Sequence, residues 1–222
     1  DEGSTLRHYK GHTASINQVL FNNDNSLILS ASADTTIKLW DIDKNELKTN
    51  FIGHTRSVTS IAFSPNNATF LSASKDNTLR LWNVKTKHST IIGTTLSPIN
   101  DIQYTPDGKH AVTAGWDLTL WSIASRKIVH KFSGHTAGIN AVAISKDGKK
   151  LISASWDNSL KLWDIETGDL VREFTGHFGG VSSVAFSADD QQIVSSGTDG
   201  TLKLWNIDNG QEVIRMVGAI ND

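Results

Sequence analysis

The amino-acid sequence predicts an all-β fold built from five copies of a four-stranded antiparallel sheet. Two observations carry this prediction. A group of residues recurs at intervals of roughly 42 positions, which is typical of a repeat architecture. Between these residues apolar and polar side chains alternate, as they do in half-buried strands, and no segment shows the spacing of an amphipathic helix.

Five tryptophans mark the repeat: Trp40, Trp82, Trp121, Trp163 and Trp205, which lie 42, 39, 42 and 42 residues apart. Gly-His pairs stand upstream at Gly11-His12, Gly53-His54, Gly134-His135 and Gly176-His177, with Gly93-Thr94 in the third place. An Asp precedes each Trp, at Asp34, Asp76, Asp117, Asp157 and Asp199. A hydroxyl residue stands four positions before each Asp, at Ser30, Ser72, Thr113, Ser153 and Ser195. Five copies of one pattern exclude coincidence.

Each repeat holds enough short strands for one sheet. Residues 27–30 and 37–40 flank the polar turn Asp34-Thr35-Thr36 and predict a β-hairpin. Turn signals such as Pro106-Asp107-Gly108 separate the first strand from the second, and a fourth strand follows each Trp, as in residues 170–174. Four antiparallel strands per repeat match one propeller blade.

The first strand of each repeat contains an irregularity. Ile16, Val19 and Phe21 are apolar at spacings of three and then two, so the alternation slips by one residue. A β-bulge produces such a slip, and bulges re-aim side chains near functional surfaces.

This pattern resembles that of the WD-repeat β-propeller family, through the Gly-His pairs, the hairpin Asp and the endings Leu39-Trp40-Asp41, Leu81-Trp82-Asn83, Leu162-Trp163-Asp164 and Leu204-Trp205-Asn206. The resemblance covers essentially the whole chain. It implies one propeller domain over residues 1–222, with repeats 11–52, 53–92, 93–133, 134–175 and 176–222.

The third repeat departs from the family pattern, with Thr94 in place of His, Ser122 after Trp121, and two residues fewer between Asp117 and Trp121. Because two is an even number, Trp121 keeps its side of the sheet, and we expect a complete blade with a tighter turn.

The resemblance also bears on ring size, because propellers of this family usually have seven blades. Five repeats predict part of a larger ring, with residues 1–10 as an orphan outer strand, since residues 6–10 resemble residues 170–174. A closed five-bladed ring with one spare strand is the alternative. An open arc would expose apolar faces and strand edges, which favours self-association.

In the family, four residues of each blade form a hydrogen-bonded tetrad. Here these would be His12, Ser30, Asp34 and Trp40; His54, Ser72, Asp76 and Trp82; His135, Ser153, Asp157 and Trp163; and His177, Ser195, Asp199 and Trp205. Ser, His and Asp also compose the triad of hydrolases, but a nucleophile needs one exposed and unique site, whereas this set recurs four times. We therefore predict a structural role, no catalytic residue and no enzyme activity. Each His lies in its own blade without Cys, so no metal site and no cofactor are expected.

Composition and net charge limit the classes of partner that the chain is expected to bind. The net charge is −2 without a basic block, which argues against nucleic acid, and no apolar run is long enough to span a membrane. The chain has no cysteine and no signal-peptide character at its N-terminus, which favours a cytoplasmic location.

Positions that differ between repeats are the candidates for partner binding. On the resemblance they lie on the face bearing the Gly-His and hairpin-Asp turns, at Ser15, Asn17, Ser57, Thr59, Lys75, Asn100, Trp116, Asn140, Trp156, Ser182 and Thr198. Trp116 and Trp156 take the same slot in successive repeats and are predicted to anchor a partner, with Asn100 and Asn140 supplying hydrogen bonds nearby. The alternative is that each ring packs over a neighbouring loop.

The predicted function is a non-catalytic scaffold that binds a peptide or partner domain on this face. The alternative is a sensory or docking module of a larger signalling or enzymatic protein.

Overall fold

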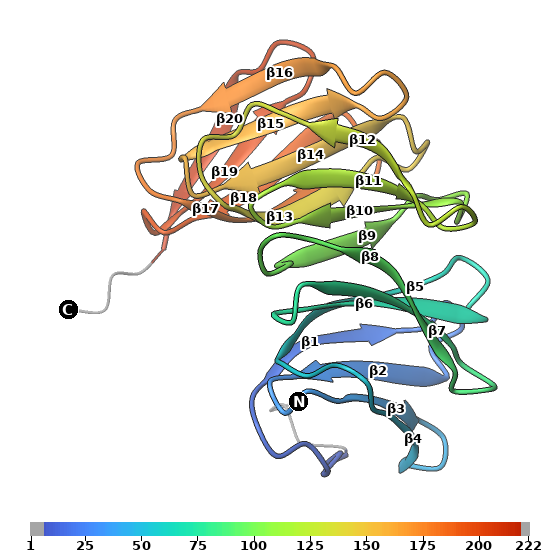
Figure 1. Cartoon of the computed structure of the whole chain (residues 1–222). Helices are drawn as coiled ribbons and strands as arrows, with labels where there is room; N and C mark the ends of the chain where they lie inside the picture. The colour runs from blue at the N-terminus through green and yellow to red at the C-terminus, as the bar shows by residue number, and fades with distance from the viewer. Residues whose placement is uncertain (1–6, 219–222) are drawn as a thin grey trace. The chain divides into compact units, whose positions relative to one another are not determined.

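The computed structural model describes residues 7–218, and the chain divides into two compact units, residues 1–94 and 95–222. All regular structure in the described residues is β-strand (Figure 1).

The first unit contains two four-stranded sheets. Blade 1 consists of β1 (Ile16–Phe21), β2 (Leu27–Ser32), β3 (Ile37–Asp41) and β4 (Glu46–Phe51). Blade 2 consists of β5 (Val58–Phe63), β6 (Thr69–Ser74), β7 (Thr78–Asn83) and β8 (Ser89–Thr94).

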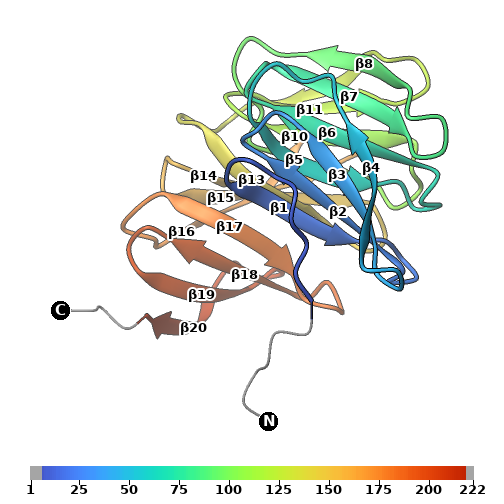
Figure 2. The same cartoon turned by 90° about the horizontal axis from the view of Figure 1, so that it is seen from below.

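The second unit contains three such sheets. Blade 3 consists of β9 (Asp101–Tyr104), β10 (His110–Ala114), β11 (Leu118–Ser122) and β12 (Ile128–Phe132). Blade 4 consists of β13 (Ile139–Ile144), β14 (Lys150–Ser155), β15 (Ser159–Asp164) and β16 (Leu170–Thr175). Blade 5 consists of β17 (Val181–Phe186), β18 (Gln192–Gly197), β19 (Thr201–Asn206) and β20 (Glu212–Val217), with β20 at its outer edge (Figure 2).

In every blade the strands pair antiparallel in chain order, so the predicted all-β fold with five four-stranded sheets is confirmed, the third repeat included. The orphan outer strand predicted over residues 1–10 is not found in the part that the structure describes, because residues 7–10 pair with no strand there. Residues 1–6 lie outside the described residues. Tyr9 instead packs edge-on against Trp40, with ring centroids 5.5 Å apart.

The predicted bulge in the first strand is present in blades 1, 2, 4 and 5, where the register shifts by one residue after Ile16, Val58, Ile139 and Val181. A second register shift lies between the third and fourth strands, directly before the Trp in blades 1, 3, 4 and 5. The alternation of apolar residues had not indicated this second shift, because the fourth strands are largely exposed and carry little pattern.

The cores lie between neighbouring blades of one unit. In the second unit, Leu160 and Leu162 of β15 pack with Phe174 against Val181 and Trp205 of blade 5. Blade 3 packs on blade 4 in the same way, and in the first unit blade 1 packs on blade 2. Alternation therefore buries one face of each sheet under the first strand and the Trp of the next blade.

Each unit also carries an apolar face that no blade of the same unit covers. On blade 5, Leu202 and Met216 are 45% and 56% exposed, whereas their counterparts in blade 4, Leu160 and Phe174, are buried. On blade 1, Ile16, Val19 and Phe21 are exposed. The exposed side chains of these faces are of the same apolar types as those buried where one blade packs on the next.

Candidate functional site

Four clusters of His, Ser, Asp and Trp are hydrogen-bonded in the structure. In blade 4, His135 Nδ1 lies 2.7 Å from Asp157 Oδ2, and His135 Nε2 lies 2.7 Å from Ser153 Oγ. The indole Nε1–H of Trp163 donates to the same Ser153 Oγ at 2.9 Å. The clusters of blades 1, 2 and 5 have the same bonds. Each cluster ties the Gly-His loop to the second and third strands and to the turn between them.

A fifth residue, which is not one of the four in the predicted tetrads, joins each cluster. It is the hydroxyl residue two positions after the Asp, namely Thr36, Thr78, Ser159 and Thr201. In blade 2, Asp76 accepts hydrogen bonds from the backbone N–H and hydroxyl of Thr78, from the N–H of Thr55 and from His54. Its signal in the sequence is the hydroxyl residue that follows each of these Asp residues at the same spacing.

These bonds control the charge of the carboxylates. Burial alone raises the pKa of Asp76 and Asp157, but the bonds donated by the hydroxyl, the backbone N–H and the imidazole outweigh burial and lower both pKa values to about 2. The pKa values of Asp34 and Asp199 are lowered by the same contacts.

The histidines of blades 2 and 4 stay neutral at neutral pH. Burial lowers the pKa of His54 and His135, although Asp76 and Asp157 oppose this shift. A neutral imidazole that donates from Nδ1 to the carboxylate leaves Nε2 to accept the Ser O–H, and the Ser oxygen then accepts the Trp N–H. Every donor in the chain of bonds has an acceptor.

The clusters share the connectivity of a hydrolase triad but not its accessibility. The four serines are at most 2% exposed, and each Ser oxygen already accepts the indole N–H. A nucleophile must reach a substrate carbonyl, and these hydroxyls have no path to one. The clusters are therefore suited to holding loops, not to attacking a substrate.

Blade 3 keeps only one bond of the cluster, from Trp121 Nε1 to Thr113 Oγ1 at 2.9 Å. Because its turn is two residues shorter, Asp117 directly precedes the third strand, at the position that Ser159 has in blade 4. The Asp117 carboxylate forms an ion pair with Lys131 at 3.3 Å. No residue of this turn takes the place that Asp157 has in blade 4.

The glycine of each Gly-His pair lies against the Trp ring of its own blade. A methyl group added to Gly134 would come within 3.1 Å of Trp163 Cη2, and the same holds for Gly11 and Trp40. A side chain at the glycine would therefore require the Trp ring to shift by a few tenths of an ångström.

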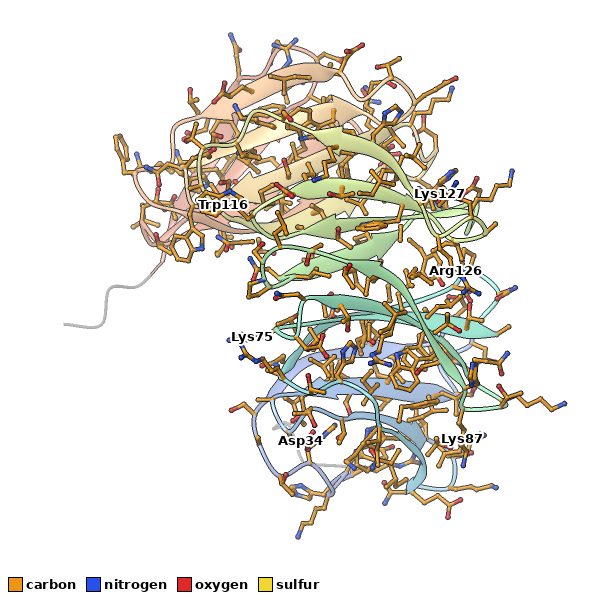
Figure 3. The ribbon with its side chains drawn as sticks, in the orientation of Figure 1. Asp34, Lys75, Lys87, Trp116, Arg126 and Lys127 are labelled. Atoms are coloured by element: carbon orange, nitrogen blue, oxygen red, sulfur yellow. The ribbon has the colours of Figure 1, made fainter. Side chains whose placement is uncertain are left out.

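Trp116 and Trp156 both lie in second-to-third-strand turns of the second unit and are 68% and 55% exposed. Figure 3 shows Trp116 at the opposite end of blade 3 from Arg126 and Lys127. The two slots are not identical, because the N–H of Trp156 donates to Gly138 O whereas that of Trp116 donates to Ser97 Oγ. The two-residue deletion in blade 3 accounts for this difference.

Trp156 both packs over a neighbouring loop and presents exposed surface that a partner could contact. A methyl group added to Gly180 would lie 2.1 Å from Trp156 Cε3, so the ring rests on the backbone of blade 5. More than half of its surface is nevertheless exposed. Packing holds the ring in place and leaves a large apolar surface open.

Three asparagines predicted to bind partners, of which Asn100 and Asn140 were expected near these rings, join blades to one another. Asn17, Asn100 and Asn140 each donate from Nδ2 to a carbonyl oxygen at the start of the next blade within their unit, those of Val58, Ile139 and Val181 at 2.6–2.8 Å. In blades 1 and 4 the bulge lies at Asn17 and Asn140, and in all three blades the amide points toward the next blade. Their amide groups act first as links between blades.

The other predicted binding residues are distributed over both units. Ser15, Lys75, Ser182 and Thr198 are exposed, and Ser57 Oγ accepts a hydrogen bond from Asn17. In the first unit Lys75 lies at the same end of the strands as Asp34 and opposite Lys87 (Figure 3). Thr59 is half-buried.

The other end of the second unit contains a cavity of about 330 Å³ between blades 3 and 4, lined by His110, Leu120, Val129, His130, Gly148, Lys149, Asp164, Ile165 and Glu166. His130 Nε2 lies 2.8 Å from the carbonyl oxygen of Glu166. Within residues 7–218 no group of three or more His, Asp or Glu side chains is arranged to hold a metal ion. No helix of this range could span a bilayer.

Comparison with known proteins shows that the repeat is a known one. The family model described as "WD domain, G-beta repeat" matches residues 3–41, 45–83, 85–121, 126–164 and 168–206. From the second match on, each match runs from the outer strand of one blade to the third strand of the next.

Relatives share this repeat. Over 165 residues the chain is 42% identical to Periodic tryptophan protein 2 of Saccharomyces cerevisiae, a match that covers 72% of this chain and 18% of the relative. It is 39% identical to the Small ribosomal subunit protein RACK1 of Caenorhabditis elegans over 166 residues, covering 72% of this chain and 51% of the relative. It is 25% identical to Pre-mRNA-processing factor 19 homolog 2 of Arabidopsis thaliana over 166 residues, which are 70% of this chain and 31% of the relative. The matches span about half or less of the length of these relatives. With five matched repeats and four hydrogen-bonded clusters, the chain belongs to the WD40 family of WD-domain, G-beta repeat proteins.

Proposed function

We propose that this chain is a non-catalytic protein-interaction module that binds a peptide or a partner domain on the face bearing the Gly-His and hairpin-Asp turns. WD40 domains typically act as protein-interaction scaffolds, which supports the general class. The observation that carries the choice of face is the exposure of Trp116 and Trp156 in turns whose backbone bonds do not depend on their side chains. Exposed Trp is enriched among residues that dominate binding energy.

The other residues proposed to contact partners are Ser15, Asn17, Ser57, Thr59 and Lys75 in the first unit, and Asn100, Asn140, Ser182 and Thr198 in the second. The asparagines would contribute mainly by keeping neighbouring blades in register under the partner. A cytoplasmic location remains part of this proposal. A docking module of a larger signalling or enzymatic protein would use the same face, and the larger size of the matched relatives keeps that alternative open.

The test is capture of partners on the immobilised chain from an extract of the organism that encodes it, quantified by mass spectrometry. Trp116→Ala combined with Trp156→Ala should weaken specific partners at least ~30-fold, as expected for loss of a binding hot spot. Arg126→Ala combined with Lys127→Ala, at the opposite end of blade 3, is the matched control and should leave capture unchanged. Partners lost only from the control variant would place binding at the other end.

A further inference from the structure

Phe178 is an exposed aromatic residue at a position where the other tetrads have Thr. Thr13, Thr55 and Thr136 follow their histidines and donate a backbone N–H to the cluster Asp, and Phe178 makes the same backbone bond to Asp199 at 2.9 Å. The fold uses the backbone of this position and not its side chain. The Phe178 side chain is 80% exposed, so burial does not explain it.

Phe178 belongs to the short segment Phe178-Gly179-Gly180, and Trp156 contacts the same segment. Trp156 rests on Gly180, and Phe178 precedes Gly180 by two residues, a span of at most about 7 Å along the backbone. Both side chains are more than half exposed. One end of the segment Phe178-Gly179-Gly180 therefore carries an exposed aromatic ring, and the other end lies against a second one.

A cation lies beside this segment. The guanidinium carbon of Arg215, on β20, is 5.8 Å from the centre of the Phe178 ring, within the range of a cation–π contact. Among residues 7–218, Arg215 takes part in none of the ion pairs found. The matching positions of the other four blades hold Asn50, Ile91, Lys131 and Glu173, so the scaffold does not require Arg here.

We propose that Trp156, Phe178 and Arg215 form a docking site for a linear peptide that carries an apolar side chain next to an Asp or Glu. The apolar side chain would cover the two rings, and the carboxylate would pair with the guanidinium, for which planar bidentate pairing is favourable. Phe178 differs from the Thr that follows the other tetrad histidines, and the positions of Trp156 and Arg215 hold different residue types in most other repeats. This inference rests on the proposed function, since it names the chemistry of a partner for the same face.

The test begins with selection of a phage-displayed library of random 12-residue peptides on the immobilised chain. The enriched peptides should combine an apolar residue with a neighbouring Asp or Glu. A synthetic copy labelled with fluorescein is then titrated with each variant by fluorescence polarisation. Phe178→Thr, which installs the residue of the other repeats and keeps the backbone bond, should weaken binding ~30-fold.

Charge is tested by Arg215→Glu, which should weaken binding at least ~10-fold, as expected for breaking an interfacial charge pair. A peptide with Lys in place of its acidic residue should recover binding to this variant. Arg126→Glu, with the same charge change at the other end of the unit, is the matched control and should bind as the unmodified chain does. Melting curves verify that every variant is folded.

Selection of no peptide, of peptides without an acidic residue, or of peptides indifferent to Phe178→Thr and Arg215→Glu would overturn this inference. If partners depend on Trp116 and Trp156 but not on Phe178 and Arg215, the proposed function stands and this site does not. If the double Trp variant also loses no partner, the proposed function itself fails.

Discussion

Blades 3 and 4 are neighbours in one unit and form the same four strands, yet only blade 4 has a complete tetrad. Both keep the bond from the Trp indole to the hydroxyl of the second strand. Both also bury the apolar residues that face the next blade. Blade 3 therefore forms four strands with the Trp–hydroxyl pair and the apolar face alone, whereas the His and Asp of blade 4 add attachment of the loop and turn.

The two turns differ in a corresponding way. In blade 4, Asn158 adopts a φ of 70°, and Thr35, Asn77 and Gly200 take the same place in blades 1, 2 and 5. The turn of blade 3 is two residues shorter and has no such residue. A left-handed residue is costly for most side chains, and the tetrad Asp holds this turn by accepting bonds from it.

The largest effect should come from the element that the two blades share. Trp163→Ala and Trp121→Ala each remove a buried ring and should each lower the free energy of unfolding by about 3–5 kcal/mol. Urea denaturation of the two variants measures this. A much smaller loss for Trp121→Ala would mean that blade 3 does not depend on its Trp, and the comparison would break.

The second-largest effect should come from the tetrad His, which blade 4 has and blade 3 lacks. His135→Ala leaves Ser153 and Asp157 short of a buried partner and should cost roughly 1–3 kcal/mol, with little change in partner affinity per folded molecule. Thr94→Ala, at the matching position of the third repeat, should cost less than about 0.5 kcal/mol. Thermal unfolding compares the two variants, and an unshifted melting curve for His135→Ala together with loss of function would favour catalysis instead.

The pH dependence should distinguish blades with a tetrad from blade 3. The pKa values of His54 and His135 are lowered by folding, so the unfolded chain binds more protons and stability falls as pH drops below about 6.5. Asp157, with its pKa lowered from 3.8 to about 2, adds a second loss of up to about 2 kcal/mol between pH 4 and pH 2. Denaturation across this range measures both steps.

A variant that lacks both groups of blade 4, His135→Ala with Asp157→Ala, serves as the control for this pH dependence. Its stability should change less between pH 7 and pH 2 than that of the unmodified chain. Equal slopes would show that the tetrad of blade 4 does not titrate with folding.

The smallest effect should come from an attempt to restore the tetrad in the third repeat. Thr94→His supplies the imidazole, but Asp117 pairs with Lys131 and the short turn offers no carboxylate at the tetrad position. The change in stability should stay within about 0.5 kcal/mol, as for an ordinary surface substitution. A gain comparable to the loss in His135→Ala would show that one residue is enough to complete the cluster.

The sequence by itself determined the five repeats, their four strands and the first bulge, and the resemblance to the WD-repeat family implied which recurring residues form each tetrad. These features are periodic, because each blade repeats the same local pairing and the same buried face. Alternation and spacing therefore report them directly.

Only the tertiary structure decided how the non-periodic residues are used. It turned the amides of Asn17, Asn100 and Asn140 toward the next blade, rested Trp156 on Gly180 and paired Asp117 with Lys131. The Asn and Trp contacts join different sheets across sequence separations of 24–41 residues, and the Asp117 contact depends on the length of one turn. Their geometry depends on how bulges, turns and blades pack, which a repeat of residue types along the chain does not record.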